Sequence, residues 1–247
     1  MSVVESIYRN NENRILITES MRTRPVISLK ERIKKGGKGL IVEYKRTSPS
    51  GFSGSKFQNV NEFAVFIKNY STAISVLSEP DYFNGALDDA VKLQSLQIPM
   101  LMKDFVDRES MILTGFNAGY DAVLLIADFL KSGLIVKLTE YAKKLGMDCL
   151  VEFHSLDSYE KIPEGENIMV GYNRRNLKTL NMEPEERSAL ELIKKRDSKI
   201  LESGIDSKNY RELFKMDFDA YLVGSSILKE PNFLVELKEE GNNYHVE

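Results

Sequence analysis

The stretch that decides the fold is Leu40-Ile-Val-Glu-Tyr-Lys-Arg-Thr-Ser-Pro-Ser-Gly51. It opens as a short apolar run and ends in charge. Glu43 and Lys45 are two residues apart, so on a β-strand both side chains point to the same face. A carboxylate and an ammonium are costly to bury without partners. We therefore expect a strand whose charged end lies at the mouth of a site, followed by a loop that begins at the Pro and Gly.

Downstream of this stretch, short apolar runs alternate with helical segments. The further predicted strands are 73–77, 99–102, 122–126, 149–152, 168–171, 199–201 and 220–223. Several are near-continuous apolar runs, which is typical of parallel strands covered on both faces. Eight strands alternating with helices in about 200 residues predict an α/β fold, a single (β/α)8 or TIM barrel. An open doubly wound sheet is the competing architecture, but no Gly-x-Gly-x-x-Gly follows an early strand.

The chain is expected to form one domain. Residues 1–39 are predicted to be an N-terminal helical extension, 40–240 the barrel, and 241–247 a polar tail that frays. Asn61 is expected to cap the helix after the first strand. Pro184 is expected to begin the helix after the sixth strand, with two glutamates in its first turn.

The composition narrows the class of protein. A chain of 247 residues that is 42% hydrophobic can bury a sizeable core. The net charge of -3, with Lys and Arg spread along the chain, gives no sign of a nucleic-acid surface, and no apolar run is long enough to span a membrane. Met1 to Asn13 lacks the apolar core of a signal peptide, and one cysteine, Cys149, excludes an internal disulfide. We therefore expect a cytoplasmic protein.

Charged residues gather at the carboxyl ends of the predicted strands, where barrels of this kind carry their chemistry. Three carboxylates and three cations converge there if the register is right: Glu43, Glu152 and Glu202, with Lys45, Lys103 and Arg175. So many charges next to apolar strands favour a ligand site over chance solvation.

The ends of the seventh and eighth strands carry Ser203-Gly204 and Gly224-Ser225-Ser226. Barrels often bind phosphate there, through backbone N–H groups and the N-terminus of a short extra helix, for which 226–230 is the candidate. Two ordinary glycine turns are the alternative reading.

Other candidates for a site are weaker. His154 and His245 cannot form a metal site by their spacing, and both are expected on the surface. Cys149 lies inside a strand and is expected in the core. Phe83 and Phe105 lie near the mouth and either belong to the core or flank an aromatic substrate.

Seven motifs resemble those of the indole-3-glycerol-phosphate synthase family, in the same order and on successive strands from about Arg24 to Glu240. They are Glu43-Tyr-Lys-Arg-Thr-Ser-Pro-Ser-Gly51, Tyr82-Phe-Asn-Gly85, Met102-Lys-Asp-Phe105, Val151-Glu152, Asn173-Arg-Arg-Asn-Leu177, Glu202-Ser-Gly-Ile205 and Val223-Gly-Ser-Ser226. The first is long and specific, whereas the last is common to phosphate-binding barrels. Together they make a specific signal.

The resemblance implies a carboxy-lyase of L-tryptophan biosynthesis. Its substrate, a small phosphosugar derivative, would be 1-(2-carboxyphenylamino)-1-deoxyribulose 5-phosphate, and its products indole-3-glycerol phosphate, carbon dioxide and water. Decarboxylation would push electrons toward an iminium formed within the substrate itself. The reaction therefore needs acid and base groups but no metal and no organic cofactor.

The resemblance also implies roles for single residues. Lys103 resembles the general acid, and Glu152 the residue that handles the protons of dehydration. Lys45 would hold the anthranilate carboxylate, and how it shares proton donation with Lys103 stays open. Glu43 and Asn173 would bind and orient the reacting hydroxyl and amine, with Glu202 and Ser203 as support. Arg175 would add positive charge to the site. The phosphate would be held by Ser48, Gly204, Gly224 and Ser225.

The sequence departs from the family pattern at three places: Tyr172 replaces a small aliphatic residue, Arg174 replaces Asn or Ser, and Leu201 replaces Ala. These changes concern packing around the sixth and seventh strands. Residues 1–39 are shorter than the family's usual extension, and we expect them to fold over the mouth and aid substrate binding.

Two alternatives remain open at this point. Another phosphosugar barrel, such as phosphoribosylanthranilate isomerase, commonly needs a Cys and an Asp as its acid–base pair, and Cys149 is poorly placed for that. A catalytically silent phosphate-binding subunit would tolerate loss of Lys103, which is retained. The sequence does not fix the oligomeric state. We expect a monomer, with association with other tryptophan-pathway enzymes left open.

Overall fold

Eight parallel strands close into a barrel in chain order, with the first paired to the last, in a computed structural model that describes residues 1–14, 21–53 and 55–244. This confirms the predicted TIM barrel, and each strand begins within one residue of its predicted start. The strands are β1 Gly39–Tyr44, β2 Ala73–Leu77, β3 Met100–Lys103, β4 Ala122–Ile126, β5 Asp148–Phe153, β6 Ile168–Asn173, β7 Lys199–Glu202 and β8 Ala220–Val223.

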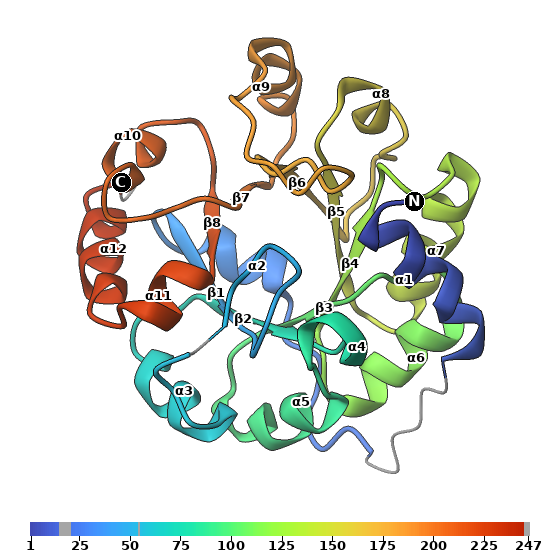
Figure 1. The fold of residues 1–247 in the computed structure, drawn as a ribbon, viewed down its shortest axis with the longest axis horizontal. Coiled ribbons are helices and arrows are strands. Elements are labelled where there is room, and N and C mark those ends of the chain that lie inside the picture. The colour runs from blue at the N-terminus through green and yellow to red at the C-terminus, as the bar shows by residue number, and fades with distance from the viewer. Residues whose placement is uncertain (15–20, 54, 245–247) are drawn as a thin grey trace.

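Helices surround the ring of strands (Figure 1). Those of the barrel are α3 Val60–Ile67, α5 Leu87–Leu93 with the 3-10 turn η2 Gln94–Leu96, α6 Glu109–Ala118, α7 Ser132–Lys144, α8 Leu156–Tyr159, α9 Arg187–Ile193, α10 Tyr210–Phe214 and α12 Phe233–Asn242. Two short helices lie in loops after strands, α4 Pro80–Phe83 and α11 Ser225–Lys229. The extension contributes α1 Val3–Asn10, η1 Asn11–Asn13 and α2 Leu29–Lys34.

The apolar core has two layers, because every strand is buried on both faces. Side chains such as Leu101, Leu150 and Ile200 fill the inside of the barrel. Their neighbours along the strands, such as Val151 and Leu201, pack outward against the helices. This alternation follows from the two-residue period of a strand, and it leaves the barrel closed beneath its mouth.

The helix after β1 is capped two residues earlier than expected. The side chain of Asn59, not that of Asn61, accepts hydrogen bonds from the first backbone N–H groups of α3. The other end of the chain also differs, because α12 runs to Asn242, past the predicted barrel limit at residue 240. His245 and the end of the predicted tail lie outside the described residues.

The helix after β6 begins at Arg187, not at Pro184 as predicted. The residues before it are used by the loop. Glu185 forms an ion pair with Arg174 at 2.5 Å, and the backbone N–H of Glu186 donates to the hydroxyl of Tyr172 at 3.0 Å. The Tyr172 ring is buried against Phe153, so this departure from the family pattern is accommodated by packing.

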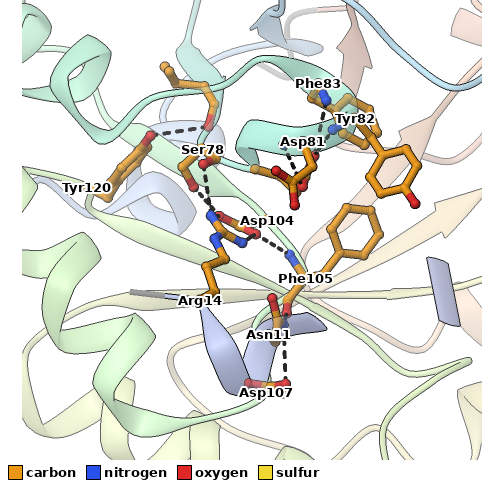
Figure 2. A network of polar contacts seen from close by, with 12 residues as sticks. Asn11, Arg14, Ser78, Asp81, Tyr82, Phe83, Asp104, Phe105, Asp107 and Tyr120 are labelled. Atoms are coloured by element: carbon orange, nitrogen blue, oxygen red, sulfur yellow. Dashed lines mark hydrogen bonds and ion pairs between the residues drawn. The ribbon is translucent and has the colours of Figure 1, made fainter. Parts of the chain in front are cut away.

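The N-terminal extension is held to the barrel by polar contacts at the end of β3 (Figure 2). The guanidinium of Arg14 makes two bonds of 2.6 Å to the carboxylate of Asp104, the residue directly after β3. Asn11 donates to the carbonyl oxygen of Phe105 at 2.6 Å. The contacts of Asn11 and Arg14 place α1 across the mouth of the barrel, on the side of β4 and α7 (Figure 1). Further along, Arg24 pairs with the buried Asp121, just before the start of β4, at 2.5 Å.

Candidate active site

A cavity of about 480 Å³ opens at the carboxyl ends of the strands. All fourteen residues that the sequence proposed for the site line it: Glu43, Lys45, Ser48, Phe83, Lys103, Phe105, Glu152, Asn173, Arg175, Glu202, Ser203, Gly204, Gly224 and Ser225. The structure therefore brings together residues from β1, β3, β5, β6 and β7 and from the segments after β1, β2, β3, β6, β7 and β8.

Lys103 lies at the centre of a buried ion cluster. Its amine is 2.5 Å from Oε2 of Glu202 and 3.1 Å from Oε2 of Glu152. The other oxygen of Glu152 accepts a hydrogen bond of 2.6 Å from the side-chain amide of Asn173. Glu152 and Glu202 are only 2% and 1% exposed, so this cluster is largely removed from water.

The surroundings shift the pKa values of this cluster in a way that suits proton transfer. Burial alone would lower the pKa of Lys103, but the charges of Glu152, Glu202 and Glu43 outweigh it and raise that pKa, so the amine stays protonated. Burial raises the pKa of Glu202 to about 8, with Lys103 opposing the rise and Glu152 adding to it. Near neutral pH a protonated amine therefore lies beside a carboxyl group that can also hold a proton.

Four charged residues of the site come from alternate strands: Glu43 from β1, Lys103 from β3, Glu152 from β5 and Glu202 from β7. In a TIM barrel, side chains from alternate strands point inward at the same level. Here the level nearest the mouth is therefore a ring of charge above apolar layers.

Glycines on the intervening strands and loops make room for that ring. A Cβ on Gly171 of β6 would collide with Oε1 of Glu202. A Cβ on Gly224, after β8, would come within 2.6 Å of Oε1 of Glu43. Sequence reasoning assigned Gly224 to phosphate binding and missed Gly171, because their closeness to these carboxylates depends on the barrel register.

Glu43 and Lys45 form a second ion pair in the cavity, 2.6 Å apart. Burial would raise the pKa of Glu43, but Lys45 and Lys103 lower it overall, so this carboxylate stays ionised. Arg175 also lines the cavity. Burial lowers the pKa of Arg175, with the charge of Glu43 opposing, and its guanidinium donates to the carbonyl oxygen of Leu180 at 2.6 Å.

One side of the cavity is apolar. The rings of Phe83 and Phe105 lie 6.0 Å apart there, and both line the cavity. Val3, Val4 and Ile7 of α1 line the cavity as well and pack in the same apolar cluster as the two rings. The two phenylalanines thus belong both to the packed interior and to the cavity wall, and together with α1 they offer an apolar surface that suits an aromatic group.

The opposite end of the cavity has the geometry of an anion site. Ser203 and Gly204 both have positive φ, 72° and 66°, which turns the chain sharply after β7. Strain of this kind at a non-glycine residue is typical of functional sites. Gly224 precedes α11, whose free N-terminal N–H groups favour an anion.

Lys208 and Lys229 also line this end of the cavity, and sequence reasoning missed both as binding residues. The amine of Lys229 lies 5.9 Å from the centre of the Phe52 ring, whose other cationic neighbour is Lys45 at 5.4 Å. The sequence did hold one indication for Lys229, because this residue lies within 226–230, the short helix expected at the phosphate site.

His154 is not the surface residue that was expected. Its side chain is 14% exposed, and both ring nitrogens have partners, the carbonyl oxygen of Asn173 and the carboxylate of Glu183.

Cys149 is buried in the core, as predicted. Among the residues that the structure describes, no group of three or more His, Cys, Asp or Glu is placed to hold a metal ion. In the same part of the chain, none of the helices has the length and hydropathy needed to cross a membrane.

Comparison with known proteins now identifies the family. A sequence model described as Indole-3-glycerol phosphate synthase matches residues 3–239. The chain is 40% identical to the indole-3-glycerol phosphate synthase of Picrophilus torridus, over 98% of this chain and 99% of that one. It is also 40% identical to the protein of that name from Thermoplasma volcanium, over 96% and 98%. The chain belongs to the indole-3-glycerol phosphate synthase family. Membership supports the synthase reading over the isomerase and the silent subunit.

Solved structures of other enzymes share the fold of this synthase. The 3-hexulose-6-phosphate synthase of Salmonella typhimurium aligns with a TM-score of 0.64 at 14% identity, over 84% of this chain and all of that one. The 3-keto-L-gulonate-6-phosphate decarboxylase of Vibrio cholerae aligns with a TM-score of 0.58 at 12% identity, over 84% of this chain and 99% of that one. At these identities the likeness concerns the barrel alone.

The crowding at Gly171 gives a testable prediction. Replacing Gly171 with Ala should push the carboxylate of Glu202 away from Lys103 and lower the synthase kcat by roughly 10- to 100-fold, because a displaced acid–base group loses its alignment. Steady-state kinetics measures the effect. Gly133→Ala on α7 is the control, since nothing lies within 4 Å of its added Cβ. Unchanged kcat in a folded Gly171→Ala protein would contradict this role of the glycine.

Proposed function

We propose that Lys103 is the general acid of the synthase reaction. We propose further that Glu152 transfers the protons of dehydration and that Glu202 returns a proton to Lys103. The observation that carries this proposal is the position of the Lys103 amine, within 3.1 Å of one carboxylate and 2.5 Å of the other inside the cavity. The activity of this chain is the conversion of 1-(2-carboxyphenylamino)-1-deoxyribulose 5-phosphate to indole-3-glycerol phosphate, carbon dioxide and water, a step in tryptophan biosynthesis.

Ring closure needs a proton on the ketone oxygen while the ring carbon that bears the carboxylate attacks the ketone carbon. A protonated Lys103 can supply that proton. Lys45, paired with Glu43, would hold the anthranilate carboxylate, and Arg175 would add positive charge in the same cavity. The aromatic ring would lie between Phe83 and Phe105 and the apolar face of α1, which excludes water from the reacting carbons.

Decarboxylation and dehydration follow. Loss of carbon dioxide leaves electrons that the iminium within the substrate accepts, and the new hydroxyl leaves as water after protonation. Glu152 would move the protons of this step, held in place by the amide of Asn173. Glu202, whose raised pKa of about 8 lets it keep a proton near neutrality, would return a proton to Lys103.

The phosphate group would bind at the other end of the cavity. Backbone N–H groups after β7 and at the start of α11 suit it, through Gly204, Gly224 and Ser225, with Ser48 on the loop after β1. Lys229 would add a charge that the sequence reading did not include. Holding the phosphate there and the aromatic ring at α1 would bring the ketone between them, beside Lys103.

Replacing Lys103 with Ala tests the assignment. Removing a general acid should lower turnover by roughly 10²- to 10⁴-fold while substrate binding changes little. Turnover is followed by the fluorescence of the indole product. Lys144→Ala, at the exposed end of α7, is the matched control and should retain full activity. A Lys103→Ala protein that turns over like the control would refute the role of Lys103, and no turnover by the unmodified chain would refute the activity itself.

We further propose that α1 aids substrate binding, since Val3, Val4 and Ile7 form part of the cavity wall. A chain that begins at Asn11 should bind a non-reactive substrate analogue about tenfold or more weakly, because apolar surface is lost from the site. Isothermal titration calorimetry measures the affinity, and thermal unfolding establishes that the barrel is still folded. Equal affinity for the full and shortened chains would contradict the proposal.

We also propose that the enzyme works as a monomer in the cytoplasm. One chain supplies every residue assigned to the reaction, and its single cysteine is buried and unpaired. Sedimentation equilibrium should give the mass of one 28.2 kDa chain. A stable dimer at assay concentrations would contradict the proposal that the enzyme is a monomer. Association with other enzymes of the pathway can be tested by adding those enzymes in the same experiment.

A further inference from the structure

The loop between β6 and α9 is a small hairpin that covers part of the cavity. The backbone N–H of Glu183 donates to the carbonyl oxygen of Arg174 at 3.0 Å, and Asn176 pairs with Asn181 at 2.9 Å. We call residues 174–183 the β6–α9 hairpin. Its two arms meet in an antiparallel bridge, which joins them into one unit.

Three side chains of this hairpin line the active-site cavity: Arg175, Leu177 and Leu180. The base of the hairpin continues directly from Asn173, the last residue of β6, whose side chain holds Glu152. The position of the hairpin therefore affects both the wall of the cavity and the orientation of a residue assigned to dehydration.

His154 joins this hairpin to β5. It lies two residues beyond Glu152, outside the cavity lining. One ring nitrogen, Nδ1, is 2.8 Å from the carbonyl oxygen of Asn173. The other, Nε2, is 2.8 Å from the carboxylate of Glu183 at the far end of the hairpin. The imidazole thus contacts both ends of the hairpin base.

The chemistry of these partners fixes the protonation that the contact requires. A carbonyl oxygen only accepts hydrogen bonds, so Nδ1 must carry a proton. A carboxylate also only accepts, so Nε2 must carry a proton too. Both bonds exist together only when the ring is an imidazolium. A neutral ring keeps only one of the two bonds. Asn173 is buried and its carbonyl oxygen would be left without this donor, whereas the side chain of Glu183 is 40% exposed and its carboxylate can turn to water. The proton therefore stays on Nδ1, a lone pair faces Glu183, and the bond to the hairpin is lost.

We propose that His154 is a positioning residue of the synthase, a proton-dependent latch that holds the β6–α9 hairpin over the cavity through Glu183. With the ring protonated, the hairpin is held at both ends of its base. When the proton leaves, the Glu183 end keeps its backbone bond to Arg174 but loses the side-chain bond to His154, so Arg175, Leu177 and Leu180 are held less firmly. The kinetic consequence rests on the proposed function, whereas the latch itself does not.

The charged groups around the imidazole favour its protonated form, which bonds to Glu183. Glu183 faces it from the hairpin, and Asp128 faces it from the turn before α7, where its carboxylate accepts the backbone N–H of His154 at 2.8 Å. Burial would lower the pKa of His154, but the bond to Asn173 and the charges of Glu183 and Asp128 raise it overall. Because the pKa of His154 is raised in the folded protein, the bond between its imidazolium and Glu183 stabilises the folded protein fully at pH values below the ordinary histidine pKa. This stabilisation is lost as the pH rises through the raised pKa.

The latch is tested first without turnover. The titration of His154 is followed by NMR, with His245→Gln, at the other histidine of the sequence, removing the second signal. In Glu183→Ala the pKa of His154 should fall toward or below its ordinary value, since the carboxylate partner is gone. Glu186→Ala, which removes an equal charge from an exposed position just beyond the hairpin, should leave it unchanged. An unaltered pKa in Glu183→Ala, or an equal change in both variants, would overturn the latch.

Kinetics then tests the effect on the site. At about pH 6 the KM of Glu183→Ala should be about five- to tenfold above that of the unmodified enzyme, and near pH 9 the two should agree, because the latch is already open. Glu183→Gln should keep a low KM at both pH values, since an amide can accept from the imidazolium or donate to the neutral ring. A KM that rises equally at all pH values would indicate a structural role only and overturn the proposal. Absence of turnover in the unmodified enzyme, with the NMR result intact, would overturn the proposed function and not the latch.

Discussion

The protonated amine of Lys103, held between two buried carboxylates, is the interaction on which the rest of the structure depends. Moving charges out of water is costly, and their mutual attraction repays this only when the geometry is well fixed. The three groups lie on β3, β5 and β7, so the barrel itself fixes their distances. A closed sheet has no free edge along which one strand could shift, which keeps these groups aligned.

The surroundings of Lys103 supply that fixed geometry from several parts of the chain. Directly after it, Asp104 is held by Arg14 of the extension, so the segment that forms the apolar wall also holds the end of β3 (Figure 2). On the other side, Gly171 leaves space for Glu202, and Asn173 holds Glu152. The N-terminal segment and the small residues between the charges are therefore parts of the site.

The sequence predicted the strands well, because parallel strands buried on both faces appear as short apolar runs at regular intervals. The loops were harder. Asn59 and Asn61 can both cap a helix, and only the chain path chose Asn59. The helix expected at Pro184 starts at Arg187, because Glu185 and Glu186 are engaged with Arg174 and Tyr172. His154 was predicted to lie on the surface, because its partner Glu183 is 29 positions away in the chain and only the folded hairpin brings the two side chains together.

The amino-acid sequence alone determined the barrel, the set of residues at its mouth and the family, because period, strand ends and local motifs depend on neighbours in the chain. The tertiary structure decided which charges touch: Lys103 with Glu152 and Glu202, Arg14 with Asp104, and His154 with Glu183. It also showed that a Cβ on Gly171 would crowd the carboxylate of Glu202. These contacts join residues far apart in the chain. The register of the strands and the path of the loops set them, and no local pattern encodes either.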